Sequence, residues 1–348
     1  MRQPRLAATL RALSQQGRDW FYLGAGAEQV GRSCERVGSP LRVADLAVHR
    51  GFFYAPAQAP FLSYDSLTTA PNSQGIALLI AQRVFEECNR ALSAPEGSAA
   101  SVHAMVEAIK LAFAERDRHV ADAQVGPPWD QLVRSLHVRK LAARIDPYLA
   151  MSEPAAHGEG DTAYFCVVDE RRNAASYIQS LFHSFGSGVM IPELGILLNN
   201  RGSAFSLAPD SLRTLQPGRR PFHTLMPCML CKNGRPWLVY GSMGGEGQPQ
   251  TALQLSTRIA RFAMDPQAAI EAPRWRWGQS YIGEAASLHL ESRFGTACIA
   301  ALRARGHTVN VVGEWDEAMG HAGAIVVEAD GVLHGGADPR GDGAAVGW

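Results

Sequence analysis

The sequence changes character between Asp161 and Thr162, and this change constrains the fold more than any other feature. Before it, apolar residues recur at spacings of three and four, which is typical of amphipathic helices. Residues 151–161 are small, polar and turn-forming, so we predict an exposed, flexible link. After it, residues 164–168 are rich in strand formers. Helices followed by strands and then by mixed elements predict an α+β protein with a layered αββα domain.

Periodicity and turn residues predict the individual elements. Helices are expected at residues 5–23, 76–92, 130–145, 253–262 and 295–305, and a short segment starts at 45–46. Residues 93–100 are expected to form a linker, and a further helix follows it and ends at about residue 120. Residues 56–75 are rich in turn formers, and Ser73 is a candidate helix cap. Strands are expected at 164–168, 174–180, 228–232, 235–240, 324–327 and 332–333. Asn233-Gly234 is the strongest hairpin signal in the chain.

Composition excludes several classes of protein. The 33 basic and 33 acidic residues give no net charge, so no field favours a nucleic acid or an anionic membrane. No apolar run reaches the roughly 20 residues that span a bilayer. The six cysteines are scattered over 348 residues, unlike a disulfide scaffold. With no signal peptide at the start of the chain, we expect a soluble cytoplasmic protein without nucleic-acid or membrane partners.

Thr162 is the most informative candidate for chemistry. Cleavage of the Asp161–Thr162 bond would give Thr162 a free α-amine in addition to its side-chain hydroxyl, both at the end of a rigid strand. An α-amine has a pKa of about 7.7–8, so it can act as a base near neutral pH. One residue would then supply both nucleophile and general base. The alternative is an ordinary threonine at the start of a strand.

Two further features complete a possible amide-cleaving site. Ser180 lies at the far end of the predicted hairpin, where strand pairing would bring its hydroxyl close to Thr162. Gly244 and Gly245 lie between a predicted strand and a helix. Glycines in such a turn expose backbone N–H groups, and the helix N-terminus adds positive potential, as an oxyanion hole requires. A tight turn without chemistry is the alternative.

Ordered motifs along nearly the whole chain resemble γ-glutamyltransferases. Those after residue 161 are similar to the start of that family's small subunit, and those before it to its large subunit. The motifs are Thr9-Leu10-Arg11, Phe21-Tyr22, Asp45-Leu46, residues 71–75, Glu107-Ala108, residues 161–169, Asn173-Ala174, and residues 185–189, 195–200, 217–221, 241–245, 272–274 and 338–340.

The resemblance implies an N-terminal-nucleophile hydrolase with an αββα sandwich, made as a precursor that cleaves itself. Asp161–Thr162 would be the processing site, giving a mostly helical large segment, 1–161, and a small segment, 162–348. Thr162 would be the nucleophile, Ser180 its assisting hydroxyl, and Gly244 and Gly245 the oxyanion hole. The segments would stay associated, with a homodimer of such heterodimers as a further expectation. No metal or organic cofactor is implied.

Some positions depart from the usual family pattern. Where γ-glutamyltransferases bind a glutamate α-amine with polar and acidic residues, this chain has Phe182, Arg201 and Ala204. A usual serine pair appears as His223-Thr224. Residues 179–182 (Gln-Ser-Leu-Phe), 200–202 (Asn-Arg-Gly) and 222–224 (Phe-His-Thr) resemble the branch of the family that includes oxamate amidohydrolase. An arginine attracts an anionic group, so we expect an oxamate-like amide substrate bound by Asn200, Arg201, His223 and Thr224. A structural role for His223 is an equal alternative.

The start of the chain departs as well, because Met1 aligns with the middle of the family's large subunit. We therefore expect a form that lacks roughly the first third of the family's length. Two alternatives to an oxamate-like amidohydrolase follow. One is a glutathione hydrolase or γ-glutamyltransferase, and the other is an inactive, truncated family member.

Other signals are set aside. Cys228 and Cys231 could suggest a zinc site or a redox pair, but residues three apart on a strand point to opposite faces. No second cysteine pair has zinc-finger spacing. Residues 274–277, Arg-Trp-Arg-Trp, could stack nucleic-acid bases, but surface packing fits a neutral chain better. The eleven histidines form no H-x-x-x-H or H-E-x-x-H pattern.

Overall fold

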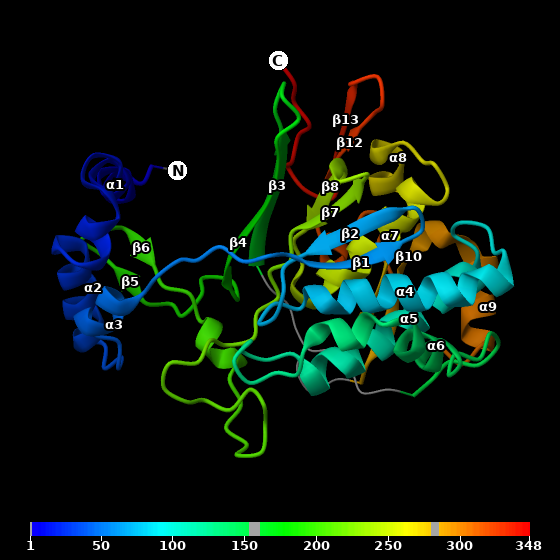
Figure 1. Ribbon diagram of the computed structural model, residues 1–348, viewed down its shortest axis with the longest axis horizontal. Helices are drawn as coiled ribbons and strands as arrows, with labels where there is room; N and C mark the ends of the chain where they lie inside the picture. The colour runs from blue at the N-terminus through cyan, green and yellow to red at the C-terminus, as the bar shows by residue number, and fades with distance from the viewer. Residues whose placement is uncertain (1, 153–160, 280–284) are drawn as a thin grey trace. The chain divides into compact units, whose positions relative to one another are not determined.

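The computed structural model describes residues 2–152, 161–279 and 285–348 (Figure 1). The predicted flexible link at 151–161 therefore lies largely outside the described residues. The chain divides into a smaller unit, Met1–Ala55 with Leu181–Arg201, and a larger unit, Pro56–Ser180 with Gly202–Trp348. The predicted 1–161 and 162–348 segments stay a prediction, because a spatial division of one continuous chain does not report a covalent break.

Helices and strands alternate along the chain. The helices are α1 (Pro4–Tyr22), α2 (Ala25–Arg36), α3 (Val43–Val48), α4 (Gly75–Leu92), α5 (Ala99–His119), α6 (Ser135–Ala142), α7 (Gln248–Ala260), α8 (Pro266–Glu271) and α9 (Gly295–Ala304). Short 3-10 helices are η1 (Trp129–Val133), η2 (Arg201–Ala204), η3 (Gly245–Gly247), η4 (Ser292–Phe294) and η5 (Glu317–Met319). The strands are β1 (Ala57–Phe61), β2 (Tyr64–Thr68), β3 (Asp161–Val168), β4 (Ala174–Phe182), β5 (Met190–Ile191), β6 (Ile196–Leu197), β7 (Cys228–Lys232), β8 (Arg235–Ser242), β9 (Trp275–Gly278), β10 (Ser287–Glu291), β11 (Val309–Val312), β12 (Ala322–Val327) and β13 (Leu333–Ala337).

The smaller unit has its own core. Helices α1 to α3 and the β5–β6 pair bury Val30, Cys34, Ile191 and Leu194. The Thr9 hydroxyl donates to the Leu194 carbonyl at 2.8 Å, which ties α1 to the β5–β6 turn. This unit is therefore held by contacts between residues far apart in sequence.

The larger unit is built on a six-stranded sheet in the order β1-β2-β7-β8-β12-β13. One face of this sheet is covered by helices. Tyr240, Ala324 and Gly336 form one row across β8, β12 and β13. Gln82 of α4 donates to the Tyr240 hydroxyl at 3.3 Å, and a Cβ on Gly336 would lie 2.9 Å from Ile270 Cδ1 of α8. This row therefore points toward the helices.

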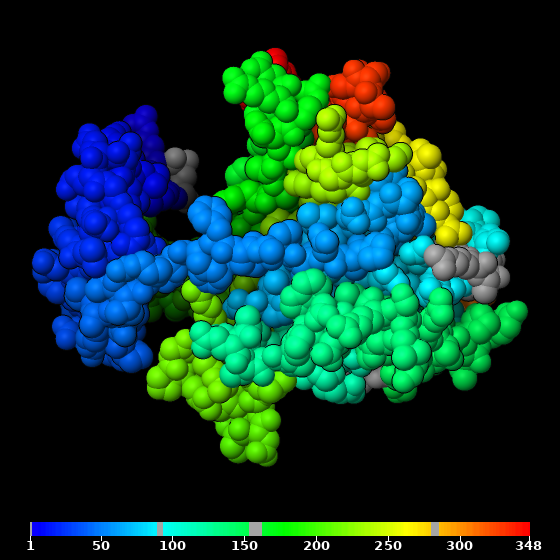
Figure 2. All heavy atoms as spheres, in the orientation of Figure 1, coloured from blue at the N-terminus to red at the C-terminus, as the bar shows by residue number. Residues whose placement is uncertain are grey.

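The opposite face of the sheet is covered by β3. Gly241 and Gly323 form the next row, and successive residues of a strand point to opposite faces. A Cβ on Gly241 would lie only 2.5 Å from the Tyr164 ring of β3, so the ring packs directly on the glycine backbone. The Tyr164 hydroxyl is hydrogen-bonded to Ser176 of β4 at 2.9 Å. Figure 2 shows the β3–β4 hairpin as the green projection beside the orange β12–β13 hairpin.

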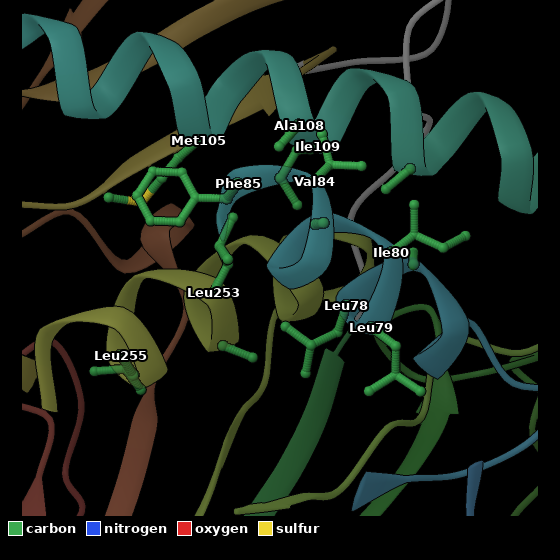
Figure 3. Packing of buried hydrophobic residues seen from close by; sticks show 14 of the residues in the cluster. Leu78, Leu79, Ile80, Val84, Phe85, Met105, Ala108, Ile109, Leu253 and Leu255 are labelled. Carbon is green, nitrogen blue, oxygen red and sulfur yellow. The ribbon is translucent and has the colours of Figure 1, made fainter. Parts of the chain in front are cut away.

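The helices of the larger unit pack around an apolar core. Leu78 and Val84 of α4, Ile109 of α5 and Leu253 of α7 are all fully buried (Figure 3). Helix layer, six-stranded sheet and β3–β4 sheet are thus stacked in the described residues, which confirms the α+β class and the sandwich arrangement. None of the described helices is long and apolar enough to cross a membrane.

Three local expectations were wrong. Residues 56–75 contain the β1–β2 hairpin, where Pro60 is tolerated because β1 is an edge strand of the sheet. The helix expected at 130–145 is divided into η1 and α6 at Arg134, whose backbone is extended. Helix α2 was missed, because its glycine-containing sequence has low helix propensity.

The β7–β8 hairpin was predicted correctly. Asn233 and Gly234 both have positive φ angles, 52° and 72°, as a type I′ turn requires. β7 also pairs with β2, with Thr68 opposite Cys228. The six-stranded sheet therefore takes strands from both sides of the Asp161–Thr162 bond.

We expect Gly241→Ala to destabilise the protein by about 1–3 kcal/mol, because the new methyl group overlaps the Tyr164 ring. Gly323→Ala is the matched control, since its Cβ would meet the same ring at an ordinary 3.5 Å. Urea unfolding of both variants measures the difference. Equal stability of the two variants would show that the ring moves aside without cost.

Candidate active site

Thr162 lies near the beginning of β3, on the same side of the strand as Tyr164. Since Tyr164 packs on Gly241, this side faces the six-stranded sheet. The Thr162 Oγ1 atom is buried and has no hydrogen-bond partner among the described residues. A buried hydroxyl without a partner is energetically costly, so it marks a position that merits a functional explanation.

Ser180 lies on β4, the partner strand of β3. The backbone N–H of Asp169 donates to the Asn173 carbonyl at 3.0 Å and closes the hairpin. Thr162 precedes Asp169 by as many residues as Ser180 follows Asn173. An antiparallel ladder therefore places these two residues opposite each other. The catalytic roles of both stay predictions.

Gly244 and Gly245 form the turn from β8 into η3 and α7. Their φ angles are 119° and 53°, which glycine adopts most readily. The Gly247 N–H donates to the Gly244 carbonyl at 2.7 Å. Because that carbonyl points into the turn, the N–H of Gly245, on the other side of the same peptide, points away from it. The α7 N-terminus adds positive potential, so this geometry suits an oxyanion hole.

Gln74 connects this turn to two predicted substrate-binding residues. Its side-chain amide donates to the carbonyls of Gly245 at 2.9 Å and Thr224 at 2.7 Å. The backbone N–H of Gln74 donates to the His223 carbonyl at 3.0 Å. The structure therefore brings His223, Thr224 and Gly245 together around one glutamine.

Arg116 of α5 holds Gln74 in turn. Its guanidinium donates to Gln74 Oε1 at 3.2 Å and to Glu246 Oε1 at 3.1 Å, and its side chain is 1% exposed. Burial alone would lower the pKa of Arg116, but the carboxylates of Glu246 and Asp117 raise it above its usual value. Sequence reasoning missed Arg116, because an arginine on a helix normally predicts a solvent-exposed face.

Asn200 and Arg201 belong to the smaller unit and are described within it. The Arg201 guanidinium lies over the Phe182 ring, 4.2 Å from its centroid, a cation–π contact. Burial lowers the pKa of Arg201 to about 10, so it stays cationic at neutral pH. Asn200 Oδ1 accepts a hydrogen bond from the His183 N–H at 3.1 Å.

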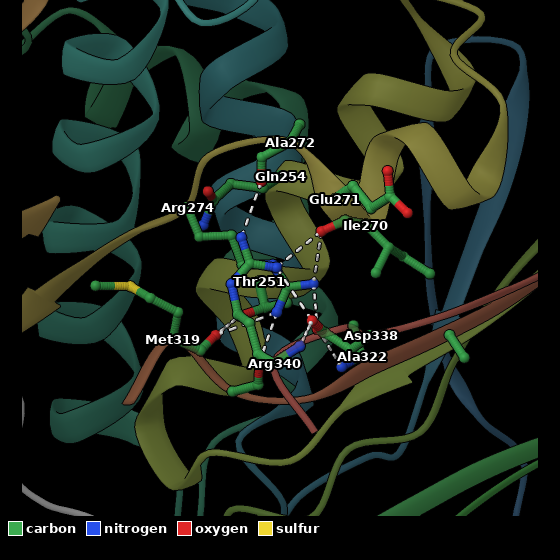
Figure 4. Close-up of polar contacts among 12 residues, drawn as sticks. Thr251, Gln254, Ile270, Glu271, Ala272, Arg274, Met319, Ala322, Asp338 and Arg340 are labelled. Atoms are coloured by element: carbon green, nitrogen blue, oxygen red, sulfur yellow. Dashed lines mark hydrogen bonds and ion pairs between the residues drawn. The ribbon is translucent and has the colours of Figure 1, made fainter. Parts of the chain in front are cut away.

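Figure 4 shows a buried ionic network around Arg274, Asp338 and Arg340. Arg274 forms an ion pair with Asp338 at 2.5 Å and donates to the Gly320 carbonyl at 2.7 Å. A Cβ on Gly320 would lie 2.5 Å from the Met243 carbonyl oxygen, so the backbones of Gly320 and the turn are in close contact. Arg274 therefore supports the segment against which the turn packs.

The interpretation of residues 274–277 as surface packing was wrong. Arg274, Trp275 and Trp277 are 0%, 2% and 5% exposed. The backbone N–H groups of both tryptophans donate to glutamine side chains of α7. Both tryptophans belong to the buried strand β9. The sequence pattern of alternating arginine and tryptophan is the same for a buried strand and for an exposed one, so it could not show that this strand is buried.

Comparison with known proteins agrees with this fold. The sequence profile of the family described as gamma-glutamyltranspeptidase matches residues 1–348. The chain belongs to this family.

Among curated relatives, it is 42% identical to the glutathione hydrolase-like YwrD proenzyme of Bacillus subtilis, covering 99% of this chain and 66% of that protein. It is also 42% identical to the oxamate amidohydrolase proenzyme of Klebsiella pneumoniae, covering 100% of this chain and 65% of that protein. The chain thus spans just under two thirds of their length. The crystal structure of cephalosporin acylase from Bacillus halodurans is 31% identical, with a TM-score of 0.91 over 100% of this chain and 63% of that one.

We expect Gln74→Met to lower the free energy of unfolding by about 1–3 kcal/mol, because the buried Thr224 and Gly245 carbonyls each lose a donor. The exposed Gln131 provides the control, since Gln131→Met removes a solvated amide. Urea unfolding measures both. A loss for Gln74→Met no larger than that for Gln131→Met would contradict the assigned hydrogen bonds.

Proposed function

We propose that this chain carries the catalytic part of an amidohydrolase that uses Thr162 as an N-terminal nucleophile. The observation on which this rests is the buried Thr162 Oγ1 without a hydrogen-bond partner among the described residues, on a strand that packs against β8. Strand β8 leads directly into the Gly244-Gly245 turn. The names of the two 42% identical relatives, both proenzymes, support the same function.

The Thr162 hydroxyl is proposed to act twice, first in the cleavage of the precursor and then in substrate turnover. In the precursor, the Thr162 hydroxyl attacks the Asp161 carbonyl, and water then cleaves the resulting ester. This leaves a carboxylate on Asp161 and a free α-amine on Thr162. In turnover, the same hydroxyl attacks the substrate amide while the α-amine takes its proton and passes it to the leaving nitrogen. The N–H groups of Gly244 and Gly245 stabilise the oxyanion, Ser180 orients the hydroxyl, and water releases the acyl group.

The proposed substrate is a small amide with a carboxylate or carbonyl beside the scissile bond, such as oxamate. Arg201 supports this, because it remains cationic and would attract an anion and repel an ammonium group. The name of the Klebsiella pneumoniae relative points to the same chemistry. His223, Thr224 and Asn200 would complete the substrate site, and the mechanism requires no metal or organic cofactor.

The two segments are proposed to stay together after cleavage. Strand β2, from the 1–161 segment, is hydrogen-bonded to β7 of the 162–348 segment from Asp65 to Thr68. Helix α4 packs on α7 across the same division. A cut at Asp161–Thr162 would break none of these contacts.

The test is the release of ammonia from oxamate by the purified protein, compared with the release of glutamate from glutathione. We expect oxamate to be the better substrate, and Arg201→Gln to raise KM for oxamate more than it lowers kcat. Preference for glutathione would support the γ-glutamyl alternative. No turnover of either, with an uncut chain, would support an inactive family member.

A further inference from the structure

Two histidines and a glutamate meet in the interior of the larger unit. His103 and Glu107 lie one turn apart on α5, and His307 follows α9. Their exposed fractions are 0%, 0% and 6%. One ligand atom from each residue lies within 4.8 Å of the others. None of these residues takes part in the proposed amide hydrolysis.

Hydrogen bonds with backbone groups fix the orientation of the His103 and Glu107 side chains, as is common for metal ligands. His103 Nε2 is 2.8 Å from the Asp146 carbonyl, which can only accept, so Nε2 carries the proton. This leaves the His103 Nδ1 lone pair directed at His307 Nε2, 2.8 Å away. Glu107 Oε2 accepts a hydrogen bond from the Met151 N–H at 2.8 Å. A histidine whose second N–H donates to a carbonyl is the usual arrangement around protein-bound metals.

A cavity next to the cluster leaves room for further ligands. Its volume is about 200 Å³, and its walls include His307, Lys110, Ser287 and Thr308. The walls are mostly polar, so water molecules could complete the coordination of a bound ion.

A neutral hydrogen bond between the two imidazoles is the competing account. It explains the short nitrogen–nitrogen distance, since two ligand atoms around a tetrahedral zinc ion lie roughly 3.3 Å apart. The Glu107 carboxylate is not part of that hydrogen bond, yet one of its oxygens lies within 4.8 Å of both ligand nitrogens. Lys110 neutralises that carboxylate at 2.7 Å, and its charge would oppose a second cation. Glu107 would attract a metal ion and Lys110 would repel it, so the affinity for a metal ion depends on Lys110.

We propose that His103 Nδ1, His307 Nε2 and the Glu107 carboxylate form a binding site for a divalent transition-metal ion such as Zn²⁺. Imidazole and carboxylate ligands suit zinc and cobalt. Lys110 forms an ion pair with the carboxylate and weakens binding by repulsion. The site links α5 to the segment between α9 and β11, so a bound ion stabilises the fold. Pattern scanning missed it because the two histidines are 204 residues apart.

The test titrates Co²⁺, and then Zn²⁺ as competitor, into the full chain purified without a histidine tag and treated with a chelator. We expect saturable binding of one Co²⁺ per chain with a visible absorption band, which Zn²⁺ removes. His307→Ala and His103→Ala should each weaken binding about tenfold or more. His137→Ala is the matched control, because this half-exposed histidine also contacts a carboxylate, that of Glu115 at 2.9 Å. It should bind as the unaltered chain does.

Lys110→Met provides an independent measurement if the histidine variants do not fold. Without Lys110, the Glu107 carboxylate is buried without its cation, and Zn²⁺ can replace that charge. We expect Zn²⁺ to raise the Tm of Lys110→Met more than that of the unaltered chain. The proposal is overturned if neither protein binds Co²⁺ saturably. It is equally overturned if binding is unchanged in both histidine variants, or if Zn²⁺ raises neither Tm.

Discussion

Thr162→Ala is expected to leave the chain uncut and to reduce amide hydrolysis by roughly a thousandfold or more, the scale of losing a catalytic nucleophile. The physical reason is that alanine has no hydroxyl to attack either the Asp161 carbonyl or the substrate. The substitution also removes the buried, unpartnered Oγ1, so it should not lower the free energy of unfolding. Gel electrophoresis, ammonia release and urea unfolding measure the three effects.

Thr162→Ser is the matched control, because it keeps the hydroxyl and removes only a methyl group. We expect it to be cut and to retain measurable turnover. Turnover by Thr162→Ala close to that of the unaltered protein would contradict the mechanism. A large loss of stability in Thr162→Ala would instead indicate a structural role for this residue.

Arg274→Met is expected to lower the free energy of unfolding by about 3–5 kcal/mol, which is enough to unfold many domains of this kind. The substitution removes the nearer of the two arginines that pair with the buried Asp338 carboxylate, at 2.5 Å, and leaves only Arg340, at 3.1 Å, among the described residues. It also removes the donor to the Gly320 carbonyl, behind the Gly244-Gly245 turn. Burial lowers the pKa of Arg274 to about 10, and the neighbouring Asp338 carboxylate opposes this shift.

Arg134→Met is the control for this effect. Arg134 pairs with Asp130 at a similar distance, 2.7 Å, but the two side chains are 66% and 51% exposed. Such a pair contributes at most about 1 kcal/mol. Urea unfolding of both variants compares them directly. Similar losses for Arg274→Met and Arg134→Met would show that the buried network is no stronger than a surface pair.

Local sequence patterns were sufficient for much of the fold. The Asn233-Gly234 turn between residues 228–232 and 235–240 predicted β7 and β8, because this turn type favours those two residues. The strand-forming residues at 164–168 and 174–180 likewise predicted β3 and β4. These elements are specified by residues close together in the chain, so one sequence is enough to find them.

Features that depend on distant residues could not be found in this way. Gln74 and Arg116 acquire their roles by contacting Gly245 and Glu246, which lie more than a hundred residues away. Pro60 suggested a turn, and only its place on an edge strand makes it compatible with the sheet. The candidate roles of Thr162, Ser180 and the two glycines came from their local sequence context and from the family resemblance, and they stay predictions.

The most direct test of the account is the amino-terminal sequence and intact mass of the purified protein, after its folding has been verified by circular dichroism. We predict two associated polypeptides, residues 1–161 and 162–348, with the second beginning Thr-Ala-Tyr-Phe. A single uncut chain of 348 residues, or a cut at another bond, would contradict the claim that Thr162 becomes a catalytic chain end.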